Sequence, residues 1–222
     1  MKINNKYLIF FGILLILTAL SLLFVQFSPI IRDEIKYKKT KNLVESIDEI
    51  VIKPEENSKI PKENIEKKKK RLVIVARDKD FSIVIPKIGA NAKVIENIDP
   101  YNSSEYQKAL TKGVAHAKGT ALPNENGNTF IFAHSSDNFY NANRYNSIFY
   151  LLNKMEKGDD IYIVYNGKVI PYKVKETKIV DKDKIEYLKN SERKKDNELT
   201  LMTCWPPGTT YKRLIVIAEK NK

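Results

Sequence analysis

Residues 198–219 read ELTLMTCWPPGTTYKRLIVIAE, two apolar runs separated by a turn that contains two prolines and a glycine. The runs Glu198–Cys204 and Arg213–Glu219 have the composition of β-strands, and the rigid WPPG turn ends the first of them. If the two strands are antiparallel neighbours, the first ends and the second begins at the same rim of the fold. Cys204 and Arg213 are then expected to lie close together.

Six further runs of this kind lie upstream: Phe81–Ile85, Lys93–Glu96, Gly113–Ala117, Asn128–Ala133, Asp160–Tyr165 and Lys168–Val180. Asn166-Gly167 between the last two predicts a hairpin with a two-residue turn. Glu105–Leu110 and Asn146–Asn153 favour short helices. Eight short strands with few helices predict an all-β domain over residues 81–222, either a sandwich or a closed barrel.

The amino end has a different character, because Tyr7 to Phe27 is a stretch of 21 residues without a charge. A helix of that length covers about 31 Å, enough for a hydrocarbon core of roughly 30 Å. A cleaved signal peptide is the alternative, but its apolar region is usually shorter, at about 7–15 residues, and no clear Ala-x-Ala site follows here. The sequence therefore predicts an uncleaved transmembrane anchor over residues 1–28.

The orientation of this anchor is not fixed by charge. More Lys and Arg follow the span than precede it, which by the positive-inside rule would place the carboxyl side inside. That rule applies weakly to long translocated domains. The side-chain chemistry of residues 81–222 favours the opposite orientation, with that domain outside the cell.

Residues 29–80 are rich in Lys, Glu, Asp and Asn and predict a charged linker between the anchor and the domain. A short helix through residues 43–51 is expected, ended by Pro54 and Pro61. The net charge of +12 is spread along the chain. The basic run Lys67–Arg71 could suggest nucleic acid, but a solvated linker near anionic lipid or wall polymer is the favoured interpretation, so no nucleic-acid partner is predicted.

Three side chains at strand ends form a set suited to acyl transfer. Cys204 is the only cysteine, so no intrachain disulfide can form, and its position beside a loop favours a nucleophile over a buried apolar residue. His134 also ends a strand and is the acid–base candidate, whereas His116 is expected to be structural. Arg213 can stabilise an oxyanion, with Lys212 as its competitor.

A zinc site is not predicted, because two histidines and one cysteine are too few and too widely spaced. No cofactor is predicted either.

At these residues the chain resembles a known family. Thr200-Leu201-Met202-Thr203-Cys204 followed by Arg213 resembles the sortase signature, a TLxTC strand with a downstream arginine. The resemblance extends over about residues 81–219, and its other parts occur in the family's order: Ile85–Gly89, Gly113–His116, Gly119–Pro123, Asn126–Asn128, Ile131–Ser135 and Lys157–Asp159. Ala133 departs from the Gly that often precedes the family's catalytic histidine.

The resemblance implies a closed eight-stranded β-barrel and a cysteine transpeptidase. Such enzymes cleave an LPxTG-like sorting signal near the carboxyl terminus of secreted proteins and transfer the protein to an amine of a cell-wall precursor or a pilin. Carried over, Cys204 forms the thioester, His134 moves the proton and Arg213 stabilises the oxyanion. The WPPG segment resembles the class D or E groups, and the lack of a second apolar span argues against the pilin-polymerising class.

Two other functions remain open from the residues alone. A wall-directed cysteine peptidase would share the thiol and the imidazole, although such enzymes usually place the cysteine before the histidine. A tethered binding or assembly domain could have the same fold without activity, but the presence of all three reactive residues argues against that.

Overall fold

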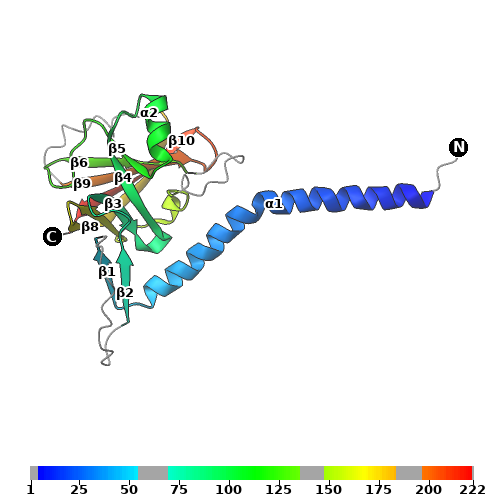
Figure 1. Cartoon of the computed structure of the whole chain (residues 1–222), viewed down its shortest axis with the longest axis horizontal. Helices are drawn as coiled ribbons and strands as arrows, with labels where there is room; N and C mark the ends of the chain where they lie inside the picture. The colour runs from blue at the N-terminus through cyan, green and yellow to red at the C-terminus, as the bar shows by residue number, and fades with distance from the viewer. Residues whose placement is uncertain (1–4, 55–69, 136–147, 184–196, 222) are drawn as a thin grey trace. The chain divides into compact units, whose positions relative to one another are not determined.

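The computed structural model describes residues 5–54, 70–135, 148–183 and 197–221 of the 222. The chain forms two compact units, residues 1–39 and residues 40–222. Helix α1 runs from Asn5 to Glu45 and includes the stretch predicted as an anchor (Figure 1). Large apolar side chains along it, such as Phe10 and Phe24, are exposed. Counting only the described residues, no helix combines the length and the apolar character that crossing a membrane requires.

The second unit contains a closed barrel of eight strands, in the order β10-β8-β7-β3-β4-β5-β6-β9 (Figure 1). Its strands are β3 (Phe81–Ile85), β4 (Ala90–Ile98), β5 (Val114–Ala117), β6 (Asn128–Phe132), β7 (Asp160–Tyr165), β8 (Lys168–Asp181), β9 (Glu198–Trp205) and β10 (Lys212–Lys220). All eight predicted strands are confirmed, and closure decides for the barrel over the sandwich. Closing the sheet leaves no long unpaired edge in the barrel.

The barrel has an apolar core, to which nearly every strand contributes a fully buried side chain. Ile83, Ile131, Ile163, Leu201 and Val216 are completely inaccessible to solvent. The predicted hairpin between β7 and β8 is also present. Asn166 and Gly167 have φ values of 50° and 75°, the left-handed conformation that a type I′ turn needs at both positions.

Part of the segment expected to be a charged linker has regular structure. The helix predicted through residues 43–51 is wrong beyond Glu45, where α1 ends, because Glu49–Lys53 forms strand β1 instead. β1 pairs in parallel with β2 (Arg71–Val75). Ile52 packs with Val84 and Val164 of the barrel in one apolar cluster. This tertiary burial outweighs the helical spacing of the local apolar residues. The domain boundaries at 28 and 80 stay a prediction.

Three short helices lie between the strands in the described part of the second unit. They are α2 (Ser103–Leu110) and the 3₁₀ turns η1 (Pro86–Ile88) and η2 (Leu152–Lys154). The expected helix at 146–153 is thus reduced to turns and η2, and its first two residues lie outside the described part. Helix α2 is well capped, since the Asn102 side chain accepts a hydrogen bond from the Glu105 N–H at 3.2 Å.

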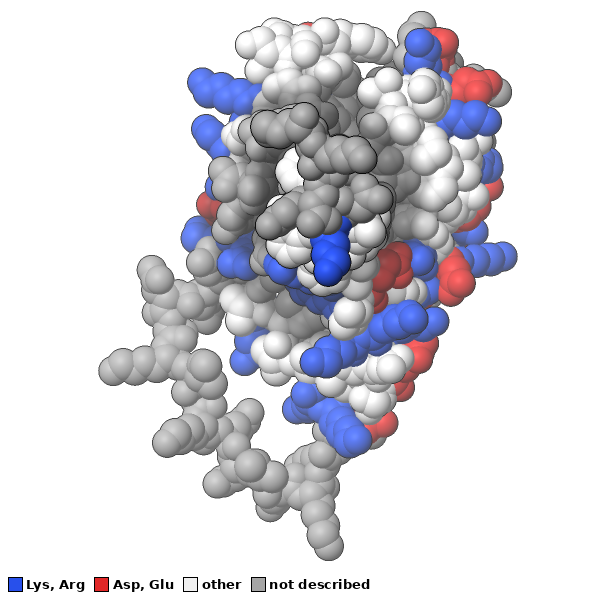
Figure 2. Space-filling model, turned by 90° about the vertical axis from the view of Figure 1, so that its right-hand side faces the viewer, with Lys and Arg blue, Asp and Glu red and all other residues white. Residues whose placement is uncertain are grey.

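Figure 2 shows Lys and Arg side chains at several places on one face, with Asp and Glu side chains among them. Several basic side chains have carboxylate partners, as Lys93 has in Asp78 and Lys173 in Asp160.

Candidate active site

The register of two neighbouring strands brings Cys204 and Arg213 together. β9 and β10 are antiparallel, and Cys204 is the direct partner of Arg213 in their ladder. Directly opposed residues of an antiparallel pair have Cβ atoms about 4.5–5.5 Å apart, and their side chains lie on the same face of the sheet. The expected convergence of these two residues is therefore present in the backbone. Cys204 is a free, partly exposed thiol.

His134 reaches the same region from the other side of β9. β6 runs parallel to β9, with Phe132 opposite Met202. The ladder continues past β6, since the Ala133 N–H donates to the Met202 carbonyl at 3.2 Å. In this register Ala133 lies beside Thr203. The residues that follow them, His134 and Cys204, are therefore also expected beside each other.

A side-chain hydrogen bond fixes these two strand ends to each other. The Thr203 hydroxyl, in a residue only 2% exposed, donates to the Ala133 carbonyl at 2.9 Å. The bond thus joins the residue before the candidate nucleophile to the residue before the candidate acid–base group. A buried hydroxyl needs such a partner, and here the partner also sets the spacing of the site.

Strand alternation separates Arg213 from its competitor. Lys212 is paired with Trp205, one step along the ladder from Cys204. Because successive side chains of a strand point to opposite faces, Lys212 is directed away from the face that carries Cys204 and Arg213. The Arg213 guanidinium is held at this rim by two hydrogen bonds, in which Nη1 donates to the carbonyls of Thr210 and Lys212, each at 3.1 Å.

A residue that the sequence did not single out contacts the candidate histidine. The Gln107 side chain on α2 lies with its Oε1 at 3.2 Å from the His134 Nε2. An amide oxygen can only accept, so Nε2 carries the proton in this contact. The neighbouring Tyr106 packs edge-on against Phe132, with ring centroids 6.3 Å apart, which places this part of α2 over the end of β6.

His116 lies in β5 and is only 2% exposed. Its Nδ1 accepts from the Asn97 N–H at 3.2 Å, and its Nε2 donates to the Ala121 carbonyl at 3.2 Å, with the Thr120 hydroxyl 3.0 Å from Nε2. Burial lowers the pKa of His116 and so favours the neutral ring. These contacts favour the structural interpretation.

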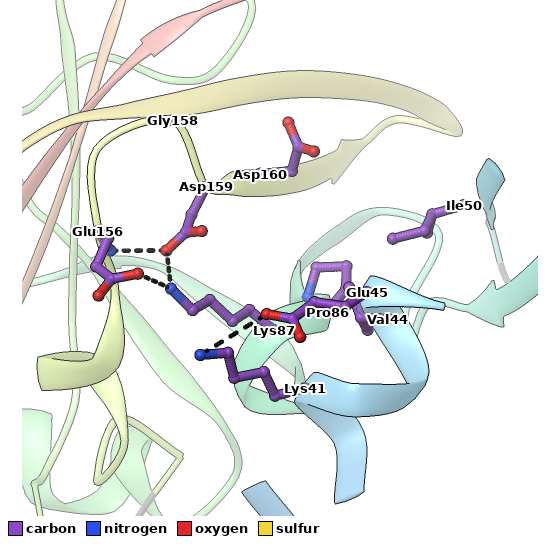
Figure 3. A pocket seen from close by; sticks show the side chains of 10 residues that line it. All are labelled: Lys41, Val44, Glu45, Ile50, Pro86, Lys87, Glu156, Gly158, Asp159 and Asp160. Carbon is purple, nitrogen blue, oxygen red and sulfur yellow. Dashed lines mark hydrogen bonds and ion pairs between the residues drawn. The ribbon is translucent and has the colours of Figure 1, made fainter. Parts of the chain in front are cut away.

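A separate pocket is lined by ten residues, including Lys41, Lys87 and Asp159, and by none of the three candidate catalytic residues (Figure 3). Lys87 Nζ forms ion pairs with Glu156 at 2.7 Å and Asp159 at 2.8 Å. This cluster joins two fragments on which the family resemblance rests, Ile85–Gly89 and Lys157–Asp159. Among the described residues, no group of three or more His, Cys, Asp and Glu side chains is placed to hold a metal.

Prediction from the sequence did not identify two residues of this site, Thr203 and Gln107. Thr203 lies inside the quoted signature, so the motif itself could have indicated a role for it. No sequence pattern indicates which carbonyl its hydroxyl contacts. Gln107 carries no signal, because it is one polar residue on a short helix and its contact with His134 spans 27 positions.

The known proteins to which this chain is similar are all sortases. The Sortase domain family matches residues 83–221 of this chain. Sortase D of Bacillus subtilis (strain 168) is 30% identical over 139 residues, which are 61% of this chain and 61% of that protein. The chain thus matches less than two thirds of that relative's length.

Solved structures agree on the fold. A Sortase D5 transpeptidase of Clostridium perfringens is 24% identical with a TM-score of 0.52, over 65% of this chain and 80% of that chain. Sortase C-1 from Actinomyces oris is 26% identical with a TM-score of 0.53, over 66% and 76% respectively.

Proposed function

The chain belongs to the sortase family, and on that premise we propose that it is a membrane-anchored cysteine transpeptidase acting on an LPxTG-like sorting signal. The observation that carries the proposal is the register of β9, in which Cys204 is the direct partner of Arg213 and Thr203 is bonded to the residue before His134. Similarity to a Sortase D and to a sortase D5 transpeptidase supports a class D-like enzyme.

In the first half-reaction His134 holds the proton of the Cys204 thiol, and the thiolate sulfur attacks the carbonyl carbon of the threonine in the sorting signal. The new C–S bond produces an oxyanion, which the Arg213 guanidinium stabilises with a charge that it does not lose at neutral pH. The C–N bond then breaks, and His134 gives its proton to the leaving amine. The products are a thioester on Cys204 and the released carboxyl-terminal peptide.

In the second half-reaction an amine attacks the thioester carbonyl. His134 takes the proton from that amine, the C–S bond breaks, and the sulfur of Cys204 returns to its starting state. The histidine acts as acid in one half and as base in the other, so the cycle closes without a net change in the enzyme. The amine belongs to a cell-wall precursor or to a pilin.

The 21 uncharged residues Tyr7–Phe27 support, from the sequence alone, a single-pass anchor in the cell membrane, with the catalytic domain on the extracellular side. Partners are then secreted proteins with a carboxyl-terminal sorting motif, together with the acceptor amine. An enzyme held at the membrane meets such proteins as they emerge.

The test uses the purified full chain in mild detergent with a library of LPxTG-like peptides and a diamine acceptor. Transfer product should form with the wild type and disappear with Cys204→Ala and His134→Ala, while both variants stay folded. Absence of cleavage with every peptide would overturn the proposal in favour of a binding domain. Cleavage by water alone, with no transfer to any amine, would make the chain a peptidase.

A further inference from the structure

The contact between Gln107 and His134 has a chemical consequence, because it distinguishes the two nitrogens of the ring. A neutral imidazole carries one proton, on either nitrogen, and its other nitrogen accepts. The Gln107 Oε1 lies 3.2 Å from Nε2 and can only accept, so it stabilises the ring form with the proton on Nε2. Nδ1 is then the unprotonated nitrogen of the neutral ring.

The backbone of Gln107 is well fixed, and its exposed side chain extends from it to His134. Its helix, α2, is capped at the amino end by Asn102 and buries Ala109 and Leu110 at the other end. Tyr106, the preceding residue, contacts Phe132 at the end of β6. The helix is therefore anchored to the same strand that leads into His134, and the hydrogen bond does not depend on a mobile loop.

We propose that Gln107 is a positioning residue that holds His134 in the Nε2–H form, so that Nδ1 is the nitrogen that exchanges the proton during transfer. The inference rests on the proposed function. When Nδ1–H gives its proton to the leaving amine, the ring becomes neutral and keeps Nε2–H on Gln107. When the incoming amine attacks, Nδ1 takes up its proton and restores the charged ring. Without Gln107 the Nε2–H form loses this hydrogen bond, and the share of the neutral ring in the form that can act falls.

Two measurements on the full chain test the proposal. The first is the ring ¹⁵N spectrum of chain labelled at histidine, in which His134→Gln assigns the signals against those of His116. In the wild type the neutral His134 ring should show a protonated Nε2 and an unprotonated Nδ1. Gln107→Ala should move both signals toward the averaged values of a mixed tautomer population, and Gln107→Glu, which keeps an acceptor oxygen, should preserve the wild-type assignment.

The second measurement is peptide transfer at saturating and limiting substrate. Gln107→Ala should lower kcat by about five- to tenfold, the worth of one hydrogen bond, with KM nearly unchanged. Gln107→Glu should restore most of that loss. Ser104→Ala, at an exposed position one turn earlier on α2, is the matched control and should leave kcat and spectrum unchanged.

The outcomes separate this inference from the function it rests on. An active wild type whose kcat and ring spectrum are both unaffected by Gln107→Ala would overturn the positioning role. A wild-type spectrum with the proton on Nδ1 would overturn it as well. If the wild type transfers no peptide, the proposed function fails, and the spectrum alone decides the tautomer assignment.

Discussion

Replacing Thr203 by valine should weaken both the fold and the site. The hydroxyl is buried and donates to the Ala133 carbonyl at 2.9 Å. Losing one such bond and leaving a buried acceptor unsatisfied costs about 1–3 kcal/mol in the free energy of unfolding. For a domain of this size, each kcal/mol lowers the Tm by about 2–4 °C.

The same substitution should reduce transfer by more than stability alone explains. The bond joins the residues that precede Cys204 and His134, so its loss lets the thiol and the imidazole separate. A displacement of about 1 Å can cost as much as 100-fold in rate, and we expect kcat to fall at least about tenfold.

Thr200→Val is the matched control on the same strand. The Thr200 hydroxyl is equally buried and donates to the Asn128 Oδ1 at 2.9 Å, away from the site. Urea unfolding should give similar losses of stability for the two variants, while peptide transfer should fall only for Thr203→Val. Equal transfer rates in the two variants, or a Thr203→Val protein as stable as the wild type, would refute the reasoning.

Four other substitutions test three separate parts of the account. Arg213→Lys keeps the charge but loses the planar donor fork, so kcat should fall by about 100-fold. Lys212→Gln should transfer peptide nearly as fast as the wild type does. The reverse ranking would assign the oxyanion role to Lys212. His116→Gln should keep substantial transfer. The wild type should lose free energy of unfolding as the pH falls below about 6.5, because the lowered pKa of His116 in the folded chain lets the unfolded chain bind the proton first. His116→Gln should lose less over the same range. Parallel pH profiles of the two proteins in urea titrations would contradict this. Lys87→Met should lower the free energy of unfolding by about 1–3 kcal/mol because Asp159 loses its half-buried partner, and an unchanged urea midpoint would show that the pair contributes nothing.

Most of the barrel could be predicted from the sequence because its signals are local. Short apolar runs such as Asp160–Tyr165, bounded by turn residues, mark a strand without reference to any other segment. The Asn166-Gly167 turn likewise follows from the conformations open to those two residues. The closure of the sheet came instead from the family resemblance, since alternation alone left the sandwich open.

The parts that escaped prediction depend on distant contacts. β1 is a strand because Ile52 packs against apolar residues of the barrel and because β2 pairs with β1 in parallel. Neither contact can be inferred from residues 49–53 alone. The choice of Cys204, His134 and Arg213 rested on residue type and strand ends, which sequence does provide. Gln107 depends on where α2 lies over β6, which only the fold determines.

Cross-linking tests most directly the central claim, that Cys204 and Arg213 are opposed on one face of the barrel. In the full chain, Arg213→Cys introduces a second thiol directly opposite Cys204, at a separation that a disulfide can bridge. Lys212→Cys, one residue earlier and on the opposite face, is the control. Under mild oxidation, intact mass and peptide mapping should show an intramolecular disulfide to Cys204 in Arg213→Cys and none in Lys212→Cys. Two free thiols in Arg213→Cys, or equal cross-linking of both variants, would contradict the account.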